Sequence, residues 1–492
     1  MGNTDKKIYI TTSIPYVNDV PHIGHALEFV QADVIARYYR QQGHNVFFMT
    51  GSDEHGTKIE KTAQKVGITP KKLVDKNSKA FKDLKKTLNI AWNQFIRTTD
   101  KKNHLPGVQK MWAALAESGD LYKRTYHGLY CAGCEAFVTD KDLIDGKCAI
   151  HCKEPELIQE ENWFFRLSAY TKTLKNKIKE KELEIIPESK ANEILSLMEK
   201  GLEDVSFSRS AQKLKWGIAV PEDATQTMYV WADALTNYIS GIGYGRDEEE
   251  FNKWWPAYVH VIGKDILRFH AAIWPAMLLS AKLPLPKKLL VHGHINVNGQ
   301  KMSKSLGNVI SPVDLVSRYG TDAVRHYLIR EIATTEDGDY SEEKFKNRYN
   351  ADLANGLGNF IARVVGMISK RHYPVNNDHR MMDLIVENKI KTTAQAIDEH
   401  INTFHLNDAV NTLWNLIAFG DMYINEKKPW DEKHSLIENE KTLYNLAVIA
   451  NAVGVLLTPF LPDTAKKIGN SITLKGKIVS VKKGTNLFPR LE

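Results

Sequence analysis

"KIYITTSIPYVNDVPHIGHALEFVQADVIARYYRQQGHNVFFMT" (Lys7 to Thr50) decides the fold. Its first six residues, 7–12, form an apolar and β-branched run that predicts a buried strand. Residues 24–41 carry the apolar spacing of a helix, and the run at residues 45–50 predicts a second strand. Because strand, helix and strand follow one another, this stretch predicts the beginning of a parallel α/β sheet.

Strand-like runs return much later in the chain, at residues 226–235, 258–265 and 288–295. The intervening residues hold short alternating segments around the cysteines and then charged stretches, which indicates an inserted domain. Beyond about residue 346 the apolar spacing is helical. We therefore predict a split Rossmann-like α/β fold with these parts: 1–117, first half of the catalytic domain; 118–225, insertion; 226–297, second half; 298–345, a lysine-rich loop and the segment after it; 346–492, α-helical bundle.

The bulk composition is that of a globular protein with several domains. The chain has 492 residues, 43% of them hydrophobic and 25% charged, and a net charge of +7 that permits an anionic partner without requiring one. No apolar run reaches the length of a membrane span. The opening residues lack the apolar core of a signal peptide, so we expect a cytoplasmic enzyme that does not bind membranes.

Two histidines mark the start of the first helix. His22 and His25 are three residues apart, so they share one helix face near free backbone amides that favour anions. Gly24 between them permits a close approach, and the two imidazoles could donate to phosphate oxygens as charge develops. Two surface histidines in a capping turn would give the same pattern, and the stretch alone leaves both interpretations open.

A lysine- and serine-rich loop, "VNGQKMSKSLGNV", occupies residues 297–309. Lys301 and Lys304 lie between Gly299 and Gly307, whose conformational freedom would make the loop mobile. Such a loop suits a polyphosphate contact that is made mainly in the transition state. The alternative is a solvated hairpin tip.

All four cysteines lie within residues 131–152, and this clustering indicates a metal site before a disulfide in a reducing compartment. Cys131 and Cys134 form a CxxC pair, and Cys148 and His151 form a CxxH pair. We predict one structural, four-coordinate Zn²⁺ held by these residues, with Cys152 as the alternate to His151. A disulfide remains the alternative.

The "HIGH" of residues 22–25 and the "KMSKS" of residues 301–305, in this order on a split α/β fold, resemble the two signatures of class I aminoacyl-tRNA synthetases. The surrounding stretches resemble the methionyl-tRNA synthetases nearly from end to end; they include "SIPYVNDVPHIGHA", "GSDEHGTKI", "YVWADALTNYI" and "VIGKDILRFHAAIWPAML". The resemblance implies activation of L-methionine by ATP with Mg²⁺, and transfer of the methionyl group to the end of tRNA(Met).

The resemblance also implies which residues form the site. A methionine pocket would consist of Ile14, Tyr16, Trp231, Leu235, Tyr238 and His292, with Asp53 pairing with the substrate ammonium. The catalytic residues would be His22, Gly24, His25, Lys301 and Lys304. ATP would contact His22, His25, Gly263, Asp265, Lys301, Ser303 and Lys304. Each of these residues could instead have a purely structural role. Trp231 and Tyr238 could belong to the hydrophobic core, His292 could be a buried histidine with satisfied hydrogen bonds, and Asp53 could be an ordinary loop residue.

In the helical region the resemblance implies an anticodon-reading group. Asn359 and Arg363 are four residues apart on one helix face, and Trp430 follows Pro429 in "NEKKPW". An exposed tryptophan can stack on an unpaired base. A buried tryptophan and a surface salt bridge of Arg363 are the alternatives. Since no further dimerising domain is visible, we expect a monomer.

Four other protein classes fit these sequence features less well. The cysteinyl enzyme holds zinc in its active site, whereas the cysteines here lie in the insertion. The valyl enzyme carries a hydrolytic editing domain larger than residues 118–225. A non-catalytic tRNA-binding paralogue would not need the intact histidines and lysines, and small nucleotidylyltransferases share the histidine signature but not the helical region.

Overall fold

The computed structural model describes residues 7–131, 136–138, 143–149, 152–303, 306–431, 433–482, 484 and 486–492. The chain forms two compact units. The first unit comprises residues 1–21, 43–85 and 91–292, and the second comprises residues 22–42, 86–90 and 293–492.

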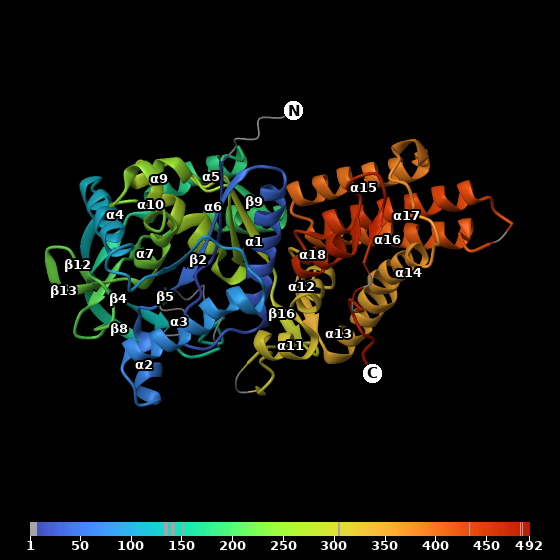
Figure 1. Cartoon of the computed structure of the whole chain (residues 1–492). Coiled ribbons are helices and arrows are strands. Elements are labelled where there is room, and N and C mark those ends of the chain that lie inside the picture. The colour runs from blue at the N-terminus through green and yellow to red at the C-terminus, as the bar shows by residue number, and fades with distance from the viewer. Residues whose placement is uncertain are drawn as a thin grey trace. The chain divides into compact units, whose positions relative to one another are not determined.

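A six-stranded, wholly parallel sheet is the centre of the first unit (Figure 1). Its strand order is β3-β2-β1-β14-β15-β9. The first two strands and the two later ones are those that the apolar runs predicted, and the split sheet is confirmed. The strands are β1 (Lys7–Thr12), β2 (Asn45–Ser52), β3 (Gln94–Arg97), β9 (Glu184–Ile186), β14 (Val259–Gly263) and β15 (Lys288–His292).

The strand predicted at residues 226–235 is wrong in its second half. β13 (Asp223–Met228) ends there and belongs to a small antiparallel sheet with β11 (Ser208–Ser210) and β12 (Ala219–Val220). The residues that follow form the helix α7 (Val230–Leu235). This helix is apolar except for Asp233, and such a short apolar run does not distinguish a helix from a strand. The main sheet therefore resumes at β14.

The segment at residues 118–225 is built around an antiparallel sheet with the order β10-β8-β4-β5. β9, which lies inside this segment, pairs with β15 and closes one edge of the parallel sheet. The boundaries of the predicted insertion remain a prediction. The elements here are β4 (Leu121–Cys131), β5 (Ala136–Val138), β6 (Leu143–Ile144), β7 (Lys147–Cys148), β8 (Glu156–Phe165), α5 (Thr171–Lys179), α6 (Glu188–Glu199) and β10 (Val205–Ser206).

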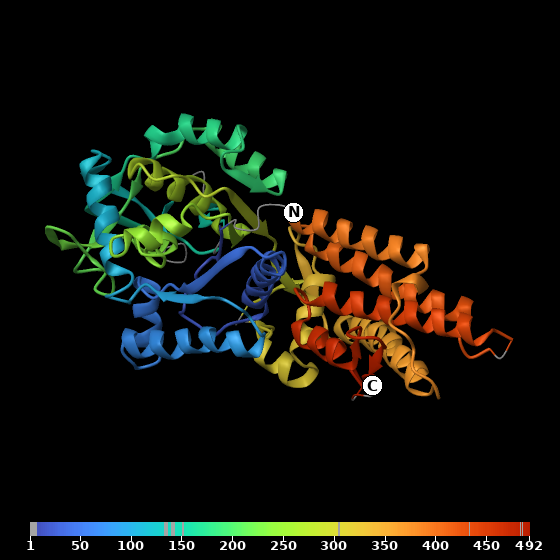
Figure 2. The same cartoon turned by 45° about the horizontal axis from the view of Figure 1, so that its top comes forward.

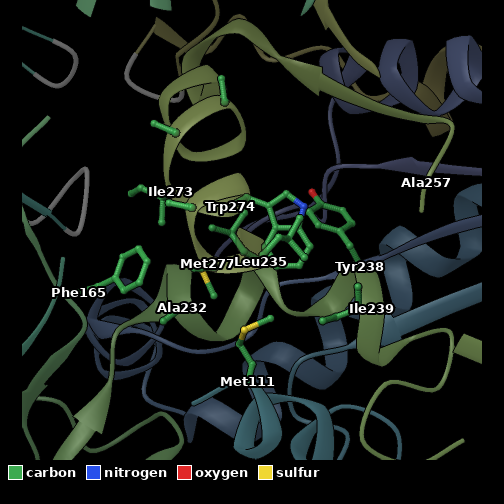
Figure 3. Close-up of a cluster of buried hydrophobic side chains, with 14 of the residues drawn as sticks. Met111, Phe165, Ala232, Leu235, Tyr238, Ile239, Ala257, Ile273, Trp274 and Met277 are labelled. Atoms are coloured by element: carbon green, nitrogen blue, oxygen red, sulfur yellow. The ribbon is translucent and has the colours of Figure 1, made fainter. Parts of the chain in front are cut away.

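Buried apolar side chains hold the remaining helices of the first unit together (Figure 3). Met111 of α4 (Leu105–Glu117) lies near Leu235 of α7 and Ile239 of α8 (Asn237–Ser240). Trp274, at the start of α10 (Trp274–Ser280), is fully buried in the same cluster. This packing fixes α7 and α8. The other helices are α2 (Thr57–Lys65), α3 (Pro70–Thr87) and α9 (Glu248–Trp254).

The second unit is mainly helical, and the predicted C-terminal helical bundle is confirmed. In Figures 1 and 2 its last long helices lie side by side. The helices are α1 (Ile23–Gln41), α11 (Pro312–Tyr319), α12 (Thr321–Arg330), α13 (Glu342–Arg348), a π-helix (Tyr349–Gly358), α14 (Asn359–Ser369), α15 (Leu384–Asn402), α16 (Leu406–Lys427), α17 (Leu436–Leu457) and α18 (Pro462–Ser471). The strands are β16 (Ile295–Val297), β17 (Gln300–Lys301), β18 (Gly338–Tyr340), β19 (Ile472–Thr473) and β20 (Ser480–Val481).

A fully buried arginine attaches α1 to the rest of the second unit. Arg325 of α12 lies 2.8 Å from the Asp33 carboxylate of α1. It also donates to the carbonyl oxygens of Leu88, Pro459 and Phe460. A buried charge pair of this kind is stable only because its remaining hydrogen bonds are satisfied. The helix that begins at the paired histidines is therefore fixed in place. No helix of the residues described here is long and apolar enough to cross a membrane.

Candidate active site

His22 and His25 form a reciprocal cap at the start of α1. The Nδ1 of His22 accepts the backbone N–H of Gly24 at 3.1 Å, and the Nδ1 of His25 accepts the backbone N–H of His22 at 3.1 Å. The ring centroids lie 3.8 Å apart. Because each Nδ1 accepts a backbone proton, each neutral ring carries its own proton on Nε2. The two Nε2–H groups are therefore donors at a helix N-terminus, where anions bind favourably.

Gly24 is constrained by its neighbours. A Cβ at this position would lie 3.0 Å from Cε1 of the His22 ring and 3.8 Å from Cε of Met302. The first distance is tighter than an ordinary contact, so a larger residue would displace the ring. Met302 belongs to the lysine-rich loop, so this loop lies beside the histidine pair within the second unit.

The lysine-rich loop begins from a rigid hairpin. β16 pairs with β17 through a turn at Asn298 and Gly299, whose φ angles are +51° and +73°. The backbone N–H of Gly299 donates to Asp339 at 2.7 Å, and that of Ser303 donates to Asn308 at 2.8 Å. Lys301 is exposed at the end of this hairpin. Lys304 lies outside the described residues, so its predicted role is untested.

In the first unit, the loop after β1 is joined to the loop after β2. The backbone N–H of Asp53 donates to the carbonyl of Pro15 at 2.9 Å, and the N–H of Val17 donates to the carbonyl of Asp53 at 3.1 Å. These bonds place Ile14 and Tyr16 next to Asp53, which is 5% exposed. Both loops lie at the carboxyl ends of parallel strands, where α/β folds bind their ligands.

Aromatic residues from two further helical segments gather around α7. Trp231 stacks on Phe269, with centroids 3.8 Å apart and planes 9° apart. The ring of His270 meets Trp231 edge-on, and its Nε2 lies 2.7 Å from the hydroxyl of Tyr238. Leu235 and Tyr238 are 1% exposed, and Trp231 is half-buried. The predicted wall residues of α7 and α8 therefore do come together.

His292 lies beside residues expected to contact ATP. It ends β15 and is the register partner of Gly263, which ends β14. A Cβ on Gly263 would lie 2.8 Å from Oδ1 of Asp265 and 3.7 Å from Cε1 of His292. The structure thus places His292 beside the two residues expected to contact ATP. The histidine that it places beside Trp231 and Tyr238 is His270.

His270 was missed by the sequence analysis, although it stands in the quoted stretch "VIGKDILRFHAAIWPAML". It belongs to a single π-helical turn, Phe269–Ile273, and such turns are often found at functional sites. Burial lowers the pKa of His270 to about 4. The ring is therefore neutral near pH 7, where one nitrogen donates and the other accepts.

Two of the predicted zinc ligands lie within the described residues. Cys131 and Cys148 are each 2% exposed and share a small cluster with Val138. Cys152 is exposed. Cys134 and His151 lie outside the described residues. Among the residues that the structure describes, no three side chains gather as a metal-binding group. The buried pair of thiols nevertheless has the soft donor chemistry that zinc prefers.

The residues expected to read the anticodon lie on α14 and after α16. Arg363 of α14 donates to Asp421 at 2.8 Å and to Asn425 at 2.9 Å, both on α16. The salt bridge that was the alternative for Arg363 is therefore present. Trp430 is 57% exposed, which excludes the alternative of a buried tryptophan. Asn359 is exposed at the first turn of α14.

Arg371 was not singled out from the sequence. It follows α14 and donates a hydrogen bond to the carbonyl oxygen of Pro429, the residue before Trp430. This bond joins the helix that carries Asn359 and Arg363 to the loop that carries the tryptophan. The three predicted residues are thus held on one connected framework within the second unit.

Comparison with known protein families gives two matches. The family model "tRNA synthetases class I (M)" matches residues 8–146 and 139–365. The model "Anticodon-binding domain of tRNA ligase" matches residues 383–483. The split parallel sheet, the histidine cap and these matches define a class I aminoacyl-tRNA synthetase.

Individual relatives narrow the class. The methionine–tRNA ligase of Caldanaerobacter subterraneus subsp. tengcongensis is 42% identical over 99% of this chain and 79% of that protein. The methionine–tRNA ligase of Thermotoga maritima is 43% identical over 96% of this chain and 76% of that protein. The structure of Mycobacterium tuberculosis methionyl-tRNA synthetase with methionyl-adenylate superimposes with a TM-score of 0.93 at 35% identity, covering 99% of this chain and 100% of that one. The chain belongs to the methionine–tRNA ligase family and is an enzyme of that family.

Proposed function

We propose that the residues described above carry out the two-step reaction of the methionine–tRNA ligases. In the first step a carboxylate oxygen of L-methionine attacks the α-phosphorus of ATP, and the bond from that phosphorus to the β-phosphate oxygen breaks. Methionyl-adenylate and pyrophosphate result. In the second step the methionyl group passes to a ribose hydroxyl at the 3′ end of tRNA(Met), and AMP leaves. The observation that carries this proposal is the reciprocal His22–His25 cap at the start of α1.

The histidine cap and the lysine-rich loop would stabilise the charge that develops on the phosphates. The Nε2–H groups of His22 and His25 donate to phosphate oxygens, and Lys301 and Lys304 neutralise the departing pyrophosphate. Gly24 would leave space for the phosphates, and the hydroxyl of Ser303 would donate a hydrogen bond to them. Mg²⁺ bound to the polyphosphate would supply further neutralisation of charge.

Methionine would bind with its ammonium group at Asp53 and its side chain against α7. Ile14, Tyr16, Trp231 and Leu235 offer an apolar and aromatic surface that suits a polarizable thioether. We add His270 to this pocket because its neutral ring is hydrogen-bonded to Tyr238 and contacts Trp231. His292 would complete the methionine pocket, and its neighbours Gly263 and Asp265 would contact ATP.

The second unit would recognise the anticodon through Asn359, Arg363 and Trp430. The exposed indole of Trp430 offers a flat surface for one unpaired base. We further propose that the enzyme is a monomer and acts in the cytoplasm. A single mass of one chain by analytical ultracentrifugation would support the monomer, and twice that mass would contradict it.

Replacing Trp430 by alanine is expected to lower kcat/KM for tRNA charging about 5- to 150-fold, the range for one lost base stack. Methionine-dependent pyrophosphate exchange should stay near the wild-type rate, since this step needs no anticodon. Leu436→Ala, which removes another exposed apolar side chain of the second unit, is the matched control and should leave both rates unchanged. An equal loss in both reactions of Trp430→Ala would show that the residue is structural.

Zinc is proposed as a structural ion held by Cys131, Cys134, Cys148 and either His151 or Cys152. The purified enzyme should contain about one zinc per chain by elemental analysis, as expected for a closed four-ligand site. Cys148→Ser should lose the metal and lower the melting temperature. Of the two alternates, Cys152→Ser should keep the metal if His151 is the fourth ligand. A metal-free enzyme with the wild-type melting temperature would contradict the zinc site.

A further inference from the structure

A buried carboxylate with two histidine partners lies directly behind the proposed methionine pocket. Asp233 is 1% exposed and stands in α7 between Trp231 and Leu235. Its Oδ2 lies 2.6 Å from Nδ1 of His55, and its Oδ1 lies 2.7 Å from Nε2 of His104. We call these three residues the histidine–aspartate clamp. None of them has a role in the reaction described above.

The clamp joins segments that are far apart in the sequence. His104 is fully buried and immediately precedes α4. Its second nitrogen, Nδ1, lies 2.8 Å from the hydroxyl of Ser240 in α8. Both nitrogens of this ring are therefore used, and α7 and α8 are tied to the start of α4. Figure 3 shows the apolar part of this region, with Met111 of α4 and Ile239 of α8 in one buried cluster.

The other side of the clamp leads to the ammonium site. His55 stands two residues after Asp53, whose backbone is hydrogen-bonded to Pro15 and Val17. The ring of His55 also packs edge-on against Trp216, with centroids 5.7 Å apart. The direct bond from His55 to Asp233 therefore connects the loop of Asp53 with the helix that carries Trp231 and Leu235.

Burying the ionised carboxylate of Asp233 costs desolvation free energy. Burial raises the pKa of Asp233, but the His55 and His104 partners outweigh this effect and hold the pKa below its ordinary value. Well-packed apolar side chains would often stabilise such a site equally well. The polar cluster instead fixes the position of α7 relative to His55 and His104. Hydrogen bonds at 2.6 and 2.7 Å restrict distances and angles more narrowly than apolar contacts do.

We propose that the histidine–aspartate clamp fixes the spacing between Asp53 and α7 and thereby selects substrates by chain length. This inference rests on the proposed assignment of Asp53 to the substrate ammonium and of α7 to the side chain. The three clamp residues are positioning residues, since they act through Asp53 and α7. An amino acid one carbon longer or shorter than methionine would meet the α7 wall at the wrong distance while its ammonium stays at Asp53.

The test compares Asp233→Asn with the wild-type enzyme in amino-acid-dependent pyrophosphate exchange. An asparagine offers one oxygen and one N–H₂ group to two histidines that both need an acceptor, so one bond is lost or reversed. We expect KM for methionine to rise about 10- to 100-fold, the effect of one lost hydrogen bond to a charged group. KM for ATP should stay unchanged. The ratio of kcat/KM for ethionine to that for methionine should rise.

Two further variants separate positioning from simple destabilisation. His55→Asn keeps an N–H donor at the place of Nδ1 and should restore the wild-type KM for methionine and the ethionine ratio, whereas His55→Ala should behave like Asp233→Asn. Asp120→Asn is the matched control: this carboxylate follows the other end of α4 and accepts from Ser280 at 2.6 Å. Its loss should leave KM for methionine and the substrate ratio unchanged.

The proposal is overturned if Asp233→Asn and His55→Ala keep the wild-type KM for methionine and ethionine ratio. It is equally overturned if KM for ATP rises in the same proportion, or if Asp120→Asn has the same effect, because the clamp would then support the fold alone. A wild-type enzyme that does not use methionine would instead contradict the proposed function. The two failures are therefore distinguishable in one series of assays.

Discussion

Replacing His25 by alanine is expected to lower the rate of methionine-dependent pyrophosphate exchange about 100- to 1,000-fold, the usual effect of removing one transition-state donor. The variant loses the Nε2–H group that would donate to a phosphate oxygen. It also loses the Nδ1 that accepts the backbone N–H of His22, so one of the two hydrogen bonds of the cap disappears. The loss should therefore appear mainly in kcat. Rapid-quench measurement of adenylate formation checks this directly.

The fold should survive this substitution. α1 remains attached through the buried Arg325–Asp33 pair, and loss of one cap typically costs about 1 kcal/mol. His44→Ala, beyond the other end of α1, is the matched control and should keep the wild-type rate. If His25→Ala retained full adenylate formation, the histidine cap would be a structural feature only, and the chemical role given to it would be wrong.

Replacing Asp53 by asparagine is expected to raise KM for methionine about 30-fold or more, since a charged partner in a desolvated site contributes roughly 2–5 kcal/mol. The backbone bonds that join this residue to Pro15 and Val17 do not involve its carboxylate and should persist. KM for ATP should therefore change little. Steady-state exchange kinetics with each substrate varied in turn measure both values.

Asp83→Asn provides the comparison for this prediction. That carboxylate lies on the exposed surface of α3, where it pairs with Lys79 at 2.5 Å. Its replacement should leave both KM values at the wild-type level. If Asp53→Asn also left KM for methionine unchanged, the ammonium group would bind elsewhere. The proposed orientation of methionine in the pocket would then be wrong.

Much of the fold was predictable because the central strands are apolar runs bounded by turns. β1, β2, β14 and β15 are buried on both sides, so their sequences differ clearly from the segments around them. β9 was not predictable, since it has only three residues and pairs with β15, which follows much later in the sequence. α7 was mistaken for a strand because a short apolar run has no clear period.

The site residues that belong to one contiguous motif were predictable from the sequence. Those that are brought together only by tertiary contacts were less predictable. The histidines of α1 act through their own helix turn, so spacing alone indicated that they share a face. His270 could not be assigned from the sequence, because its contact with Trp231 depends on the π-helical turn that carries it. The clamp was invisible in the sequence because His55, His104 and Asp233 are joined only by the packing of three separate segments.

The most direct test of the account is pyrophosphate exchange into ATP, measured without tRNA for each of the twenty amino acids. The account predicts strong exchange with methionine and only background exchange with the other nineteen, because the pocket around α7 is apolar and the ammonium site is fixed by Asp53. Exchange driven by a different amino acid would contradict the pocket. No exchange with any amino acid, from folded and zinc-containing enzyme, would contradict the catalytic role of the histidine cap and the lysine-rich loop.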